Sequence, residues 1–390
     1  MIAVRNRTAI AGIGRTVTDR DPDVDPMAHL AQALTSACAD AGLSRREIDG
    51  VIVNLAPEEG SMDKLPEMLG LPSVRWSFQS WFHGRLEPTC LATGVWAVLA
   101  GQADYVACIS TSQTLADFKH GYETRGREKS REGGGPHLEN PPSGLISVGG
   151  GAALAWRKYL TKYGGDPDAL GAVAVTQREW AHRQPEAYFC GRPISQADYL
   201  ASPYVVEPLR LLDHCVPGNA AFCLIVTTAE RARDAPKPPV YVSGLQGSSS
   251  GREHFIFSRT GLGVGQQTDE PYVAPDMPVY AAAGISRDEV QVFGALDAFS
   301  PVVLFTLEEF GFCAEGEALD WVQDGRTAPG GVLPLNTCGG GLSDVESFGW
   351  GHTVDLVRQL RGEAGDAQVP GVKVAQYATP DRSSIILTAD

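Results

Sequence analysis

The chain has 390 residues, of which 43% are hydrophobic, so it is long enough to bury one large core or two. Its net charge of −15 and the lack of a long basic run exclude nucleic acid and an anionic membrane as expected partners. No apolar stretch reaches the roughly 18 residues that indicate a membrane span, and no signal peptide opens the chain. The eight cysteines form no CxxC pair, so we expect reduced thiols, no metal site and a cytoplasmic protein.

Predicted elements alternate between strand and helix along both ends of the chain. The first part is predicted to form strand 8–13, helix 26–41, strand 50–55, helix 88–101 and strand 104–111. The second part is predicted to form strand 239–245, helix 276–283, strand 290–296, helix 301–311, strand 332–336, helix 350–361, and strands 372–377 and 383–388. This alternation is typical of an α/β protein with a mainly parallel sheet that helices cover on both faces.

The segment between these two parts has a different character. Residues 117–150 are charged and rich in glycine and proline, which predicts a surface excursion. Residues 164–220 contain helix-like pieces. We therefore expect a loop insertion at about 112–220 that covers a site or an interface. A surface addition without a function fits the same pattern.

One internal repeat indicates how the chain is organised. The segment AGLSRREIDGVIV at 41–53 recurs as AGISRDEVQVFGA at 283–295. In each copy a glycine ends an alanine-rich helix and an apolar strand follows, as an α/β unit requires. Chance similarity of two such connections is the alternative. The matching order of positions favours a duplicated domain, with one half at 1–235 and the other at 236–390.

The stretch LPLNTCGGGLSDVES at 333–347 combines an apolar run with three glycines and two carboxylates. The apolar start predicts a strand, the glycines predict a turn, and a helix pattern follows. Glycines in such a turn let the backbone approach a ligand closely. Asp344 and Glu346 follow the glycines, so the sequence places carboxylates where the turn leads into the helix.

Several blocks of the chain resemble one known family. They are AYFCGRPIS at 187–195, VEPLRLLDHC at 206–215, LDAFSPVVLFTLEEFGFCAEGE at 296–317 and LPLNTCGGGLS at 333–343. Over almost its whole length the chain is similar to the thiolase superfamily, in its lipid-transfer or sterol-carrier branch. Within that branch it is most similar to the thiolase-like subunits of steroid side-chain-cleaving aldolases. The resemblance implies a thiolase fold with a duplicated five-layered α-β-α-β-α architecture.

The resemblance also implies substrates and partners. The expected substrate is a coenzyme A thioester, and no covalently bound cofactor is expected. A homodimer is expected, in which first-half strands pair across a two-fold axis. The aldolase relatives further imply a separate zinc-ribbon and OB-fold subunit that helps to hold coenzyme A.

The nucleophilic cysteine of a thiolase has no counterpart at its usual place in this chain. The resemblance puts that place near His83 and Gly84, and Cys90 lies two turns further on. Cys90 could have the lowered pKa of a nucleophile if its helix began at Pro88, because a helix N-terminus stabilises a thiolate. The alternative, which we favour, is a packed thiol, because free cysteine is commonly buried.

Glu346 falls where a thiolase carries its catalytic histidine and where the aldolase-type relatives carry a tyrosine. A buried glutamate whose pKa is raised toward neutrality can act as a general base. The alternative is a solvated carboxylate that the dipole of the following helix stabilises. The residues expected to contact the substrate are His83, Gly84, Leu296, Gly340, Gly341 and Phe348.

The remaining positions of the family pattern differ from those of a thiolase. Leu296 replaces the residue that orients a catalytic water, and Thr379 stands near the place of the second cysteine. Asp297 keeps the acidic neighbour in its block and is a candidate catalytic residue, although a buried structural acceptor is its simpler role. Backbone N–H groups near Gly84 and Gly340 are expected to form an oxyanion hole.

Three functions remain open on this pattern. The first is retro-aldol cleavage of a β-hydroxyacyl-CoA without a covalent intermediate, with Glu346 as the base. The second is a catalytically degenerate subunit that binds a partner or an acyl chain. The third is an acyltransferase that uses Cys90. A Claisen condensation through an acyl-cysteine is not expected, because the cysteines of the thiolase pattern are missing.

Overall fold

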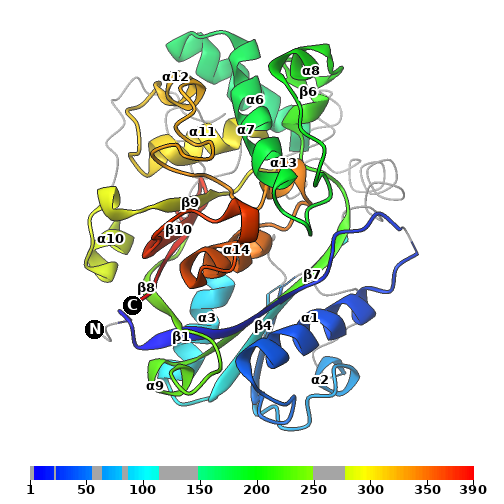
Figure 1. Cartoon of the computed structure of the whole chain (residues 1–390), viewed down its shortest axis with the longest axis vertical. Helices are drawn as coiled ribbons and strands as arrows, with labels where there is room; N and C mark the ends of the chain where they lie inside the picture. The colour runs from blue at the N-terminus through cyan, green and yellow to red at the C-terminus, as the bar shows by residue number, and fades with distance from the viewer. Residues whose placement is uncertain (1–3, 22, 55–63, 81–86, 114–147, 249–276) are drawn as a thin grey trace, which may run out of the picture.

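The computed structural model describes residues 4–21, 23–54, 64–80, 87–113, 148–248 and 277–390. The first-half elements are β1 (Thr8–Arg15), α1 (Pro26–Ala41), β2 (Gly50–Asn54), α2 (Leu65–Met68), β3 (Trp76–Ser80), α3 (Glu87–Leu99) and β4 (Tyr105–Gln113). They are followed by α6 (Val148–Tyr163), α7 (Gly171–His182), α8 (Gln196–Ala201), β5 (Tyr204–Val206), β6 (Leu209–Arg210), β7 (Asn219–Thr228) and α9 (Ala229–Ala232). The second-half elements are β8 (Val240–Gln246), α10 (Pro278–Ala283), β9 (Val292–Ala295), α11 (Ser300–Glu309), α12 (Ala318–Gln323), α13 (Gly340–Ser343), α14 (Trp350–Arg361), β10 (Val374–Ala378) and β11 (Ser384–Thr388) (Figure 1).

Nine strands of the described ranges form one sheet in the order β3-β2-β4-β7-β1-β8-β11-β10-β9. Strand β1 joins the two halves, because it pairs with β7 on one side and with β8 on the other. Parallel pairing is confined to β3–β2–β4 and to β9–β10, and the other neighbours are antiparallel. The prediction of a mainly parallel sheet was therefore wrong. It overlooked β7, and it did not allow for the short β10–β11 connection, which suits antiparallel neighbours.

The two repeated segments occupy equivalent places in the fold. Residues 41–53 run from the end of α1 into β2, and residues 283–295 run from the end of α10 into β9. Both helices end at a glycine with left-handed backbone, with φ of 70° at Gly42 and 66° at Gly284. The order of elements is thus repeated, as the duplication requires. The boundaries of the halves at 1–235 and 236–390 stay predictions.

Apolar clusters on both sides of the sheet define its layers. Side chains alternate along a strand, so Ala9 and Ala11 of β1 face α1 while Ile10 faces the opposite cluster. That opposite cluster lies between the two halves and contains buried residues of both α3 and α14. A third cluster covers the outer face of the second half and contains most of the buried residues of α11. The two halves of the single sheet thus lie on opposite sides of α3 and α14, which gives the layers helix, sheet, helix, sheet, helix.

Several segments differ from the sequence prediction, and three of them are long enough to affect the main sheet. Residues 332–336 form no strand, because only Leu335 pairs, through one parallel bridge to Phe293 of β9. Strands β3 and β7 were not predicted. The sequence of β7, NAAFCLIVTT, is buried along nearly its whole length, so it lacks the alternation of a half-exposed strand.

Helices α6 and α7 of the insertion pack on the second half. Trp156 and Tyr159 of α6 and Val173 of α7 share the third cluster with Phe305 of α11. Helix α7 also contacts α13, which lies in the glycine-rich turn (Figure 1). The insertion therefore covers the region where the candidate site lies. Most of the predicted excursion at 117–150 lies outside the described residues.

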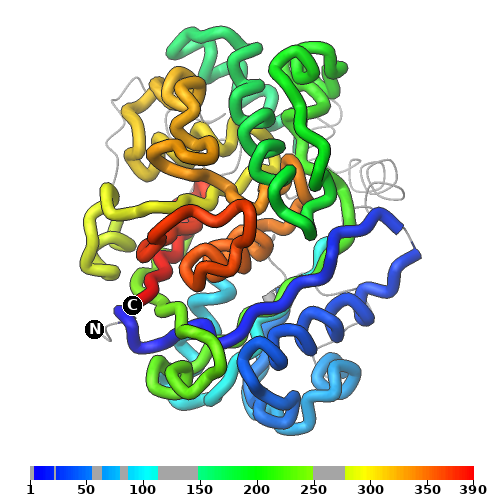
Figure 2. Tube along the Cα trace, viewed as in Figure 1, coloured from blue at the N-terminus to red at the C-terminus, as the bar shows by residue number. Residues whose placement is uncertain are grey.

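The first and last strands of the described chain, β1 (blue) and β11 (red), both pair with β8 (Figure 2). The hydroxyl of Ser243 is 2.5 Å from the Asn6 side-chain oxygen and 2.6 Å from the Thr388 hydroxyl. The Tyr241 hydroxyl donates to the carboxylate of Asp390. Strand β8 thus links the first strand of the chain to the last.

Candidate active site

The glycine-rich turn brings backbone against a buried carboxylate. Gly339 and Gly340 both have left-handed backbone, with φ of 92° and 61°. A Cβ on Gly340 would overlap the side chain of Asp297, so only glycine fits there. Asp297 accepts hydrogen bonds from the backbone N–H of Gly341 at 2.9 Å and of Leu342 at 3.2 Å. Its role as a buried acceptor, expected from the sequence, is confirmed.

His352 of α14 completes the surroundings of this carboxylate. Its Nε2 lies 3.0 Å from Oδ1 of Asp297, and both side chains are fully buried. Burial, the largest single influence, lowers the pKa of His352, but the carboxylates of Asp297, Glu346 and Asp355 together hold the pKa above the ordinary value. The contact with Asp297 therefore favours the protonated form of His352.

Glu346 lies next to this pair with its side chain shielded from solvent. The residue is 2% exposed, and its Oε1 accepts a hydrogen bond from the N–H of Phe348 at 2.8 Å. Its Oε2 has no hydrogen-bond partner of normal geometry among the described residues. Burial, and then the charge of Asp297, raise the pKa of Glu346 to about 7. The expected rise in pKa is confirmed, and the alternative of a solvated carboxylate is wrong.

The backbone of residues 215–216, called the strap below, hydrogen-bonds to two other parts of the site. The N–H of Cys215 donates to the carbonyl of Ala298, and the N–H of Val216 donates to the carbonyl of Gly341. The carbonyl of Val216 in turn accepts from the N–H of Glu346 at 3.1 Å. The strap therefore holds Cys215 between the block that carries Asp297 and the turn that carries Glu346.

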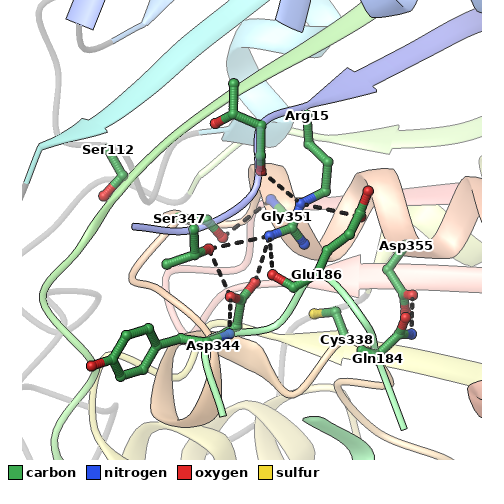
Figure 3. A network of polar contacts seen from close by, with 12 residues as sticks. Arg15, Ser112, Gln184, Glu186, Cys338, Asp344, Ser347, Gly351 and Asp355 are labelled. Atoms are coloured by element: carbon green, nitrogen blue, oxygen red, sulfur yellow. Dashed lines mark hydrogen bonds and ion pairs between the residues drawn. The ribbon is translucent and has the colours of Figure 1, made fainter. Parts of the chain in front are cut away.

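An ion-pair network anchors the turn to the first half (Figure 3). The carboxylate of Asp344 accepts from Arg15 of β1 at 3.0 Å, from the Thr18 hydroxyl at 2.7 Å and from the N–H of Tyr188 at 3.0 Å. The side chains of Arg15 and Asp344 are 4% and 5% exposed. Glu186 lies 3.5 Å from the other side of Arg15. Because Asp344 precedes Glu346 by two residues, this network also fixes the position of the Glu346 backbone.

The other predicted site residues lie at different depths. Leu296 is 1% exposed, and its N–H donates to the carbonyl of Ala378. Phe348 is partly buried with a left-handed backbone, φ 52°. Cys90 is 2% exposed and belongs to the central-layer core, in a helix that begins at Glu87 in the described chain. His83 and Gly84 lie outside the described residues.

The backbone donors of the turn are mostly engaged within the protein. Asp297 takes the N–H of Gly341, and the N–H of Gly340 donates to the sulfur of Cys338 at 3.4 Å. Sulfur is a weak acceptor, but Gly340 is not a free donor in this structure. The expected oxyanion hole at Gly340 therefore needs a further donor. Both amide atoms of Gln177 in α7 are buried without a partner among the described residues: its Oε1 is the atom next to Gly340, and its Nε2 is a donor.

Sequence reasoning missed three residues that the structure places here, namely Gln177, Cys215 and His352. His352 lies within a helix that was predicted correctly, but nothing in the helix pattern singles it out. Gln177 and Cys215 are remote in sequence from the turn. Only the block VEPLRLLDHC, which ends at Cys215, offered a signal, and it was used for the resemblance alone.

The described parts of the chain set two limits on its chemistry. No His, Cys, Asp and Glu side chains gather there in a group of three or more suited to a metal ion. No helix within those ranges is both long and apolar enough to span a lipid bilayer. The buried groups of the site are carboxylates, an imidazole, a thiol and an amide, which can move protons and donate hydrogen bonds.

Comparison with known proteins gives the same picture over the full length. A family model described as "Thiolase C-terminal domain-like" matches residues 277–379. A steroid side-chain-cleaving aldolase of Thermomonospora curvata is 31% identical over 404 residues, which cover 100% of both chains. A 17-hydroxy-3-oxo-4-pregnene-20-carboxyl-CoA lyase of Mycobacterium tuberculosis is 31% identical over 362 residues, covering 91% of this chain and 92% of that protein. A solved structure described as "Ltp2-ChsH2(DUF35) aldolase" has a TM-score of 0.85 and 29% identity, covering 99% of each chain.

The duplicated layers and the buried carboxylates at the glycine-rich turn define a thiolase-like protein. The similarity extends to each end of the relatives, so it is not limited to one half of the fold. The chain belongs to the family of thiolase-like steroid side-chain-cleaving aldolases. The family and the thiolase fold expected from the sequence are confirmed, as is a carbon–carbon lyase at the level of the family.

Proposed function

We propose that this chain cleaves a carbon–carbon bond of a β-hydroxyacyl-CoA by a retro-aldol step, with Glu346 as the base. The observation that carries the proposal is the buried Glu346 carboxylate with one unpartnered oxygen and a pKa of about 7. A general base is most effective when its pKa lies near the working pH. The relatives named as an aldolase and a CoA lyase support the reaction class.

The step balances without a cofactor. Glu346 takes the proton of the β-hydroxyl, that oxygen becomes the carbonyl of the ketone or aldehyde product, and the α–β carbon–carbon bond breaks. Its electron pair forms the enolate of the shortened thioester, which the protonated Glu346 then protonates at the α-carbon. The enolate needs a hydrogen-bond donor, and the unpartnered amide of Gln177 is the donor that we assign to it.

The proposal includes partners and a location. We assign a coenzyme A thioester as the substrate, with no covalently bound cofactor, and a cytoplasmic location. We also assign a homodimer, for which the end position of β3 in the sheet leaves an edge to pair. A zinc-ribbon and OB-fold subunit that helps to hold coenzyme A is supported by the compound name of the solved aldolase, "Ltp2-ChsH2(DUF35)".

The test is Glu346→Gln, which keeps size and hydrogen bonding but cannot accept the proton. Loss of a general base lowers kcat by about 10²–10⁴-fold. Cleavage of a panel of β-hydroxyacyl-CoA thioesters is measured with and without a co-purified zinc-ribbon subunit, and the exposed Glu67→Gln is the matched control. Full activity in Glu346→Gln would remove Glu346 from the mechanism. A wild type that cleaves nothing on the panel with its partner present would favour the non-catalytic subunit instead.

A further inference from the structure

The thiol of Cys215 lies on the same side of the turn as the two buried carboxylates. A Cβ built on Gly341 would lie 3.3 Å from Oδ1 of Asp297, 3.3 Å from Oε2 of Glu346 and 3.5 Å from Cβ of Cys215. These three side chains thus surround the one position that a side chain at residue 341 would occupy. The strap through Val216 fixes the backbone of Cys215 relative to both carboxylates.

The environment makes this thiol a hydrogen-bond donor rather than a nucleophile. Burial, and then the nearby Glu346 carboxylate, raise the pKa of the Cys215 thiol well above its ordinary value. The sulfur therefore keeps its proton near neutral pH, where Glu346 titrates. A neutral S–H group can donate, although weakly, to a carboxylate oxygen.

One carboxylate oxygen of Glu346 can accept a hydrogen bond from such a donor. Its Oε1 already accepts from the N–H of Phe348, whereas its Oε2 is buried and has no partner of normal geometry among the described residues. A buried carboxylate oxygen without a donor is costly to keep charged. The thiol of Cys215 is within hydrogen-bonding reach of Glu346, and its backbone is fixed beside the turn.

On the basis of the proposed function, we propose that Cys215 is the positioning residue of Glu346. Its thiol donates to one lone pair of Oε2 when Glu346 is ionised, which orients the carboxylate and leaves the other lone pair of that oxygen to receive the substrate proton. Cys215 does not contact the reacting atoms in this role and forms no covalent bond.

The charged and titratable neighbours of Glu346 act in different directions. Asp297, from the loop after β9, opposes its ionisation, and His352 of α14 favours it. Tyr377 of β10 also interacts with Glu346, and its hydroxyl is neutral because burial raises its pKa well above the ordinary value. Cys215 is thus a neutral neighbour whose removal changes the hydrogen bonding of Glu346 without changing the charge around it.

The experiment compares Cys215→Ala and Cys215→Ser with wild type, and uses Cys190→Ser as the control. Cys190 is partly exposed, and its thiol lies 3.6 Å from the carbonyl of His182. The pH dependence of kcat/KM reports the pKa of the base in the free enzyme. Cys215→Ala should raise that pKa by about 0.5–1 unit, because the charged form loses a hydrogen bond. Cys215→Ser should leave it at or below the wild-type value, because a hydroxyl is a stronger donor than a thiol.

A second measurement does not depend on turnover. The carboxyl band of Glu346 is followed through pH in the infrared difference spectrum between each protein and its Glu346→Gln counterpart. An unchanged or lowered titration midpoint in Cys215→Ala overturns the inference, and so does the same upward shift in Cys190→Ser. If the midpoint shifts as expected but Glu346→Gln keeps full activity, the positioning contact stands and the proposed function fails.

Discussion

Glu346→Gln should change the stability of the protein in a way that depends on pH. Folding raises the pKa of Glu346 from an ordinary value near 4.5 to about 7. Between these two values the native state binds a proton that the unfolded state has released. The free energy of unfolding therefore falls as pH rises from about 4.5 to 7, and this loss is complete above the native pKa. Glutamine does not titrate, so this decrease in the free energy of unfolding is absent from the variant.

The size of the effect follows from the width of that window. A pKa difference of one unit corresponds to about 1.4 kcal/mol, so a rise from 4.5 to about 7 gives an upper limit of about 3 kcal/mol. A typical native protein is stable by about 5–15 kcal/mol, so the effect is measurable. At pH 4, where the carboxyl is protonated in both states, the variant and the wild type should differ little. At pH 8 the variant should be the more stable protein, by up to about 3 kcal/mol.

The assay is urea unfolding of wild type, Glu346→Gln and the exposed control Glu67→Gln at pH 4, 6 and 8. The quantity of interest is the difference between variant and wild type at each pH, which should grow only for Glu346→Gln. A difference that stays constant from pH 4 to pH 8 would refute the reasoning, because it would mean that Glu346 is ionised to the same extent in the folded and unfolded states.

Two further predictions concern Asp344, which anchors the turn, and Cys90. Asp344→Ala should lower the free energy of unfolding by about 3–5 kcal/mol, because it leaves the buried Arg15 without its main partner. The control is Asp104→Ala, because Asp104 and its partner Arg231 are both exposed. This change should lower the free energy of unfolding by less than about 1 kcal/mol. Urea titrations that give equal decreases at the two sites would contradict the prediction. Cys90, buried in the central layer, should carry no acyl group after incubation with acyl-CoA. Mass spectrometry tests this, and a stable thioester on Cys90 would disprove it.

Helix ends were the part of the fold best predicted from sequence. The bounds predicted for helices 26–41 and 350–361 are those of α1 and α14. Each of these helices stops at a glycine with left-handed backbone, and the first begins with a proline, so local chemistry determines where they end. Strand direction was harder, because no local signal distinguishes a parallel from an antiparallel neighbour. The fully buried β7 also lacks the alternation by which half-exposed strands are recognised.

The candidate site was predictable only where one continuous segment carries it. Glu346 and Asp297 lie in blocks whose glycines and family pattern are visible in the sequence. Gln177 and Cys215 reach the turn through α7 and through the backbone of Val216, and such contacts have no signature in the sequences of the segments themselves. The identity of a donor beside a base depends on tertiary packing, so the structure was needed to find it.

The place of β1 between β7 and β8 has a consequence for how the chain is made. Strand β1 covers residues 8–15, yet its two neighbours in the sheet begin at residues 219 and 240. Ribosomes add roughly 5–20 residues per second, so a nascent β1 waits on the order of 10–40 s before β7 exists.

During that interval β1 has neither β7 nor β8 to pair with, so its apolar residues cannot be buried in the sheet. Contacts between strands so far apart in sequence are slow to form and leave strand edges exposed to aggregation. The two halves are joined through β1. The nascent chain therefore depends on α1 or on chaperones to protect β1 until synthesis is well past the midpoint of the chain.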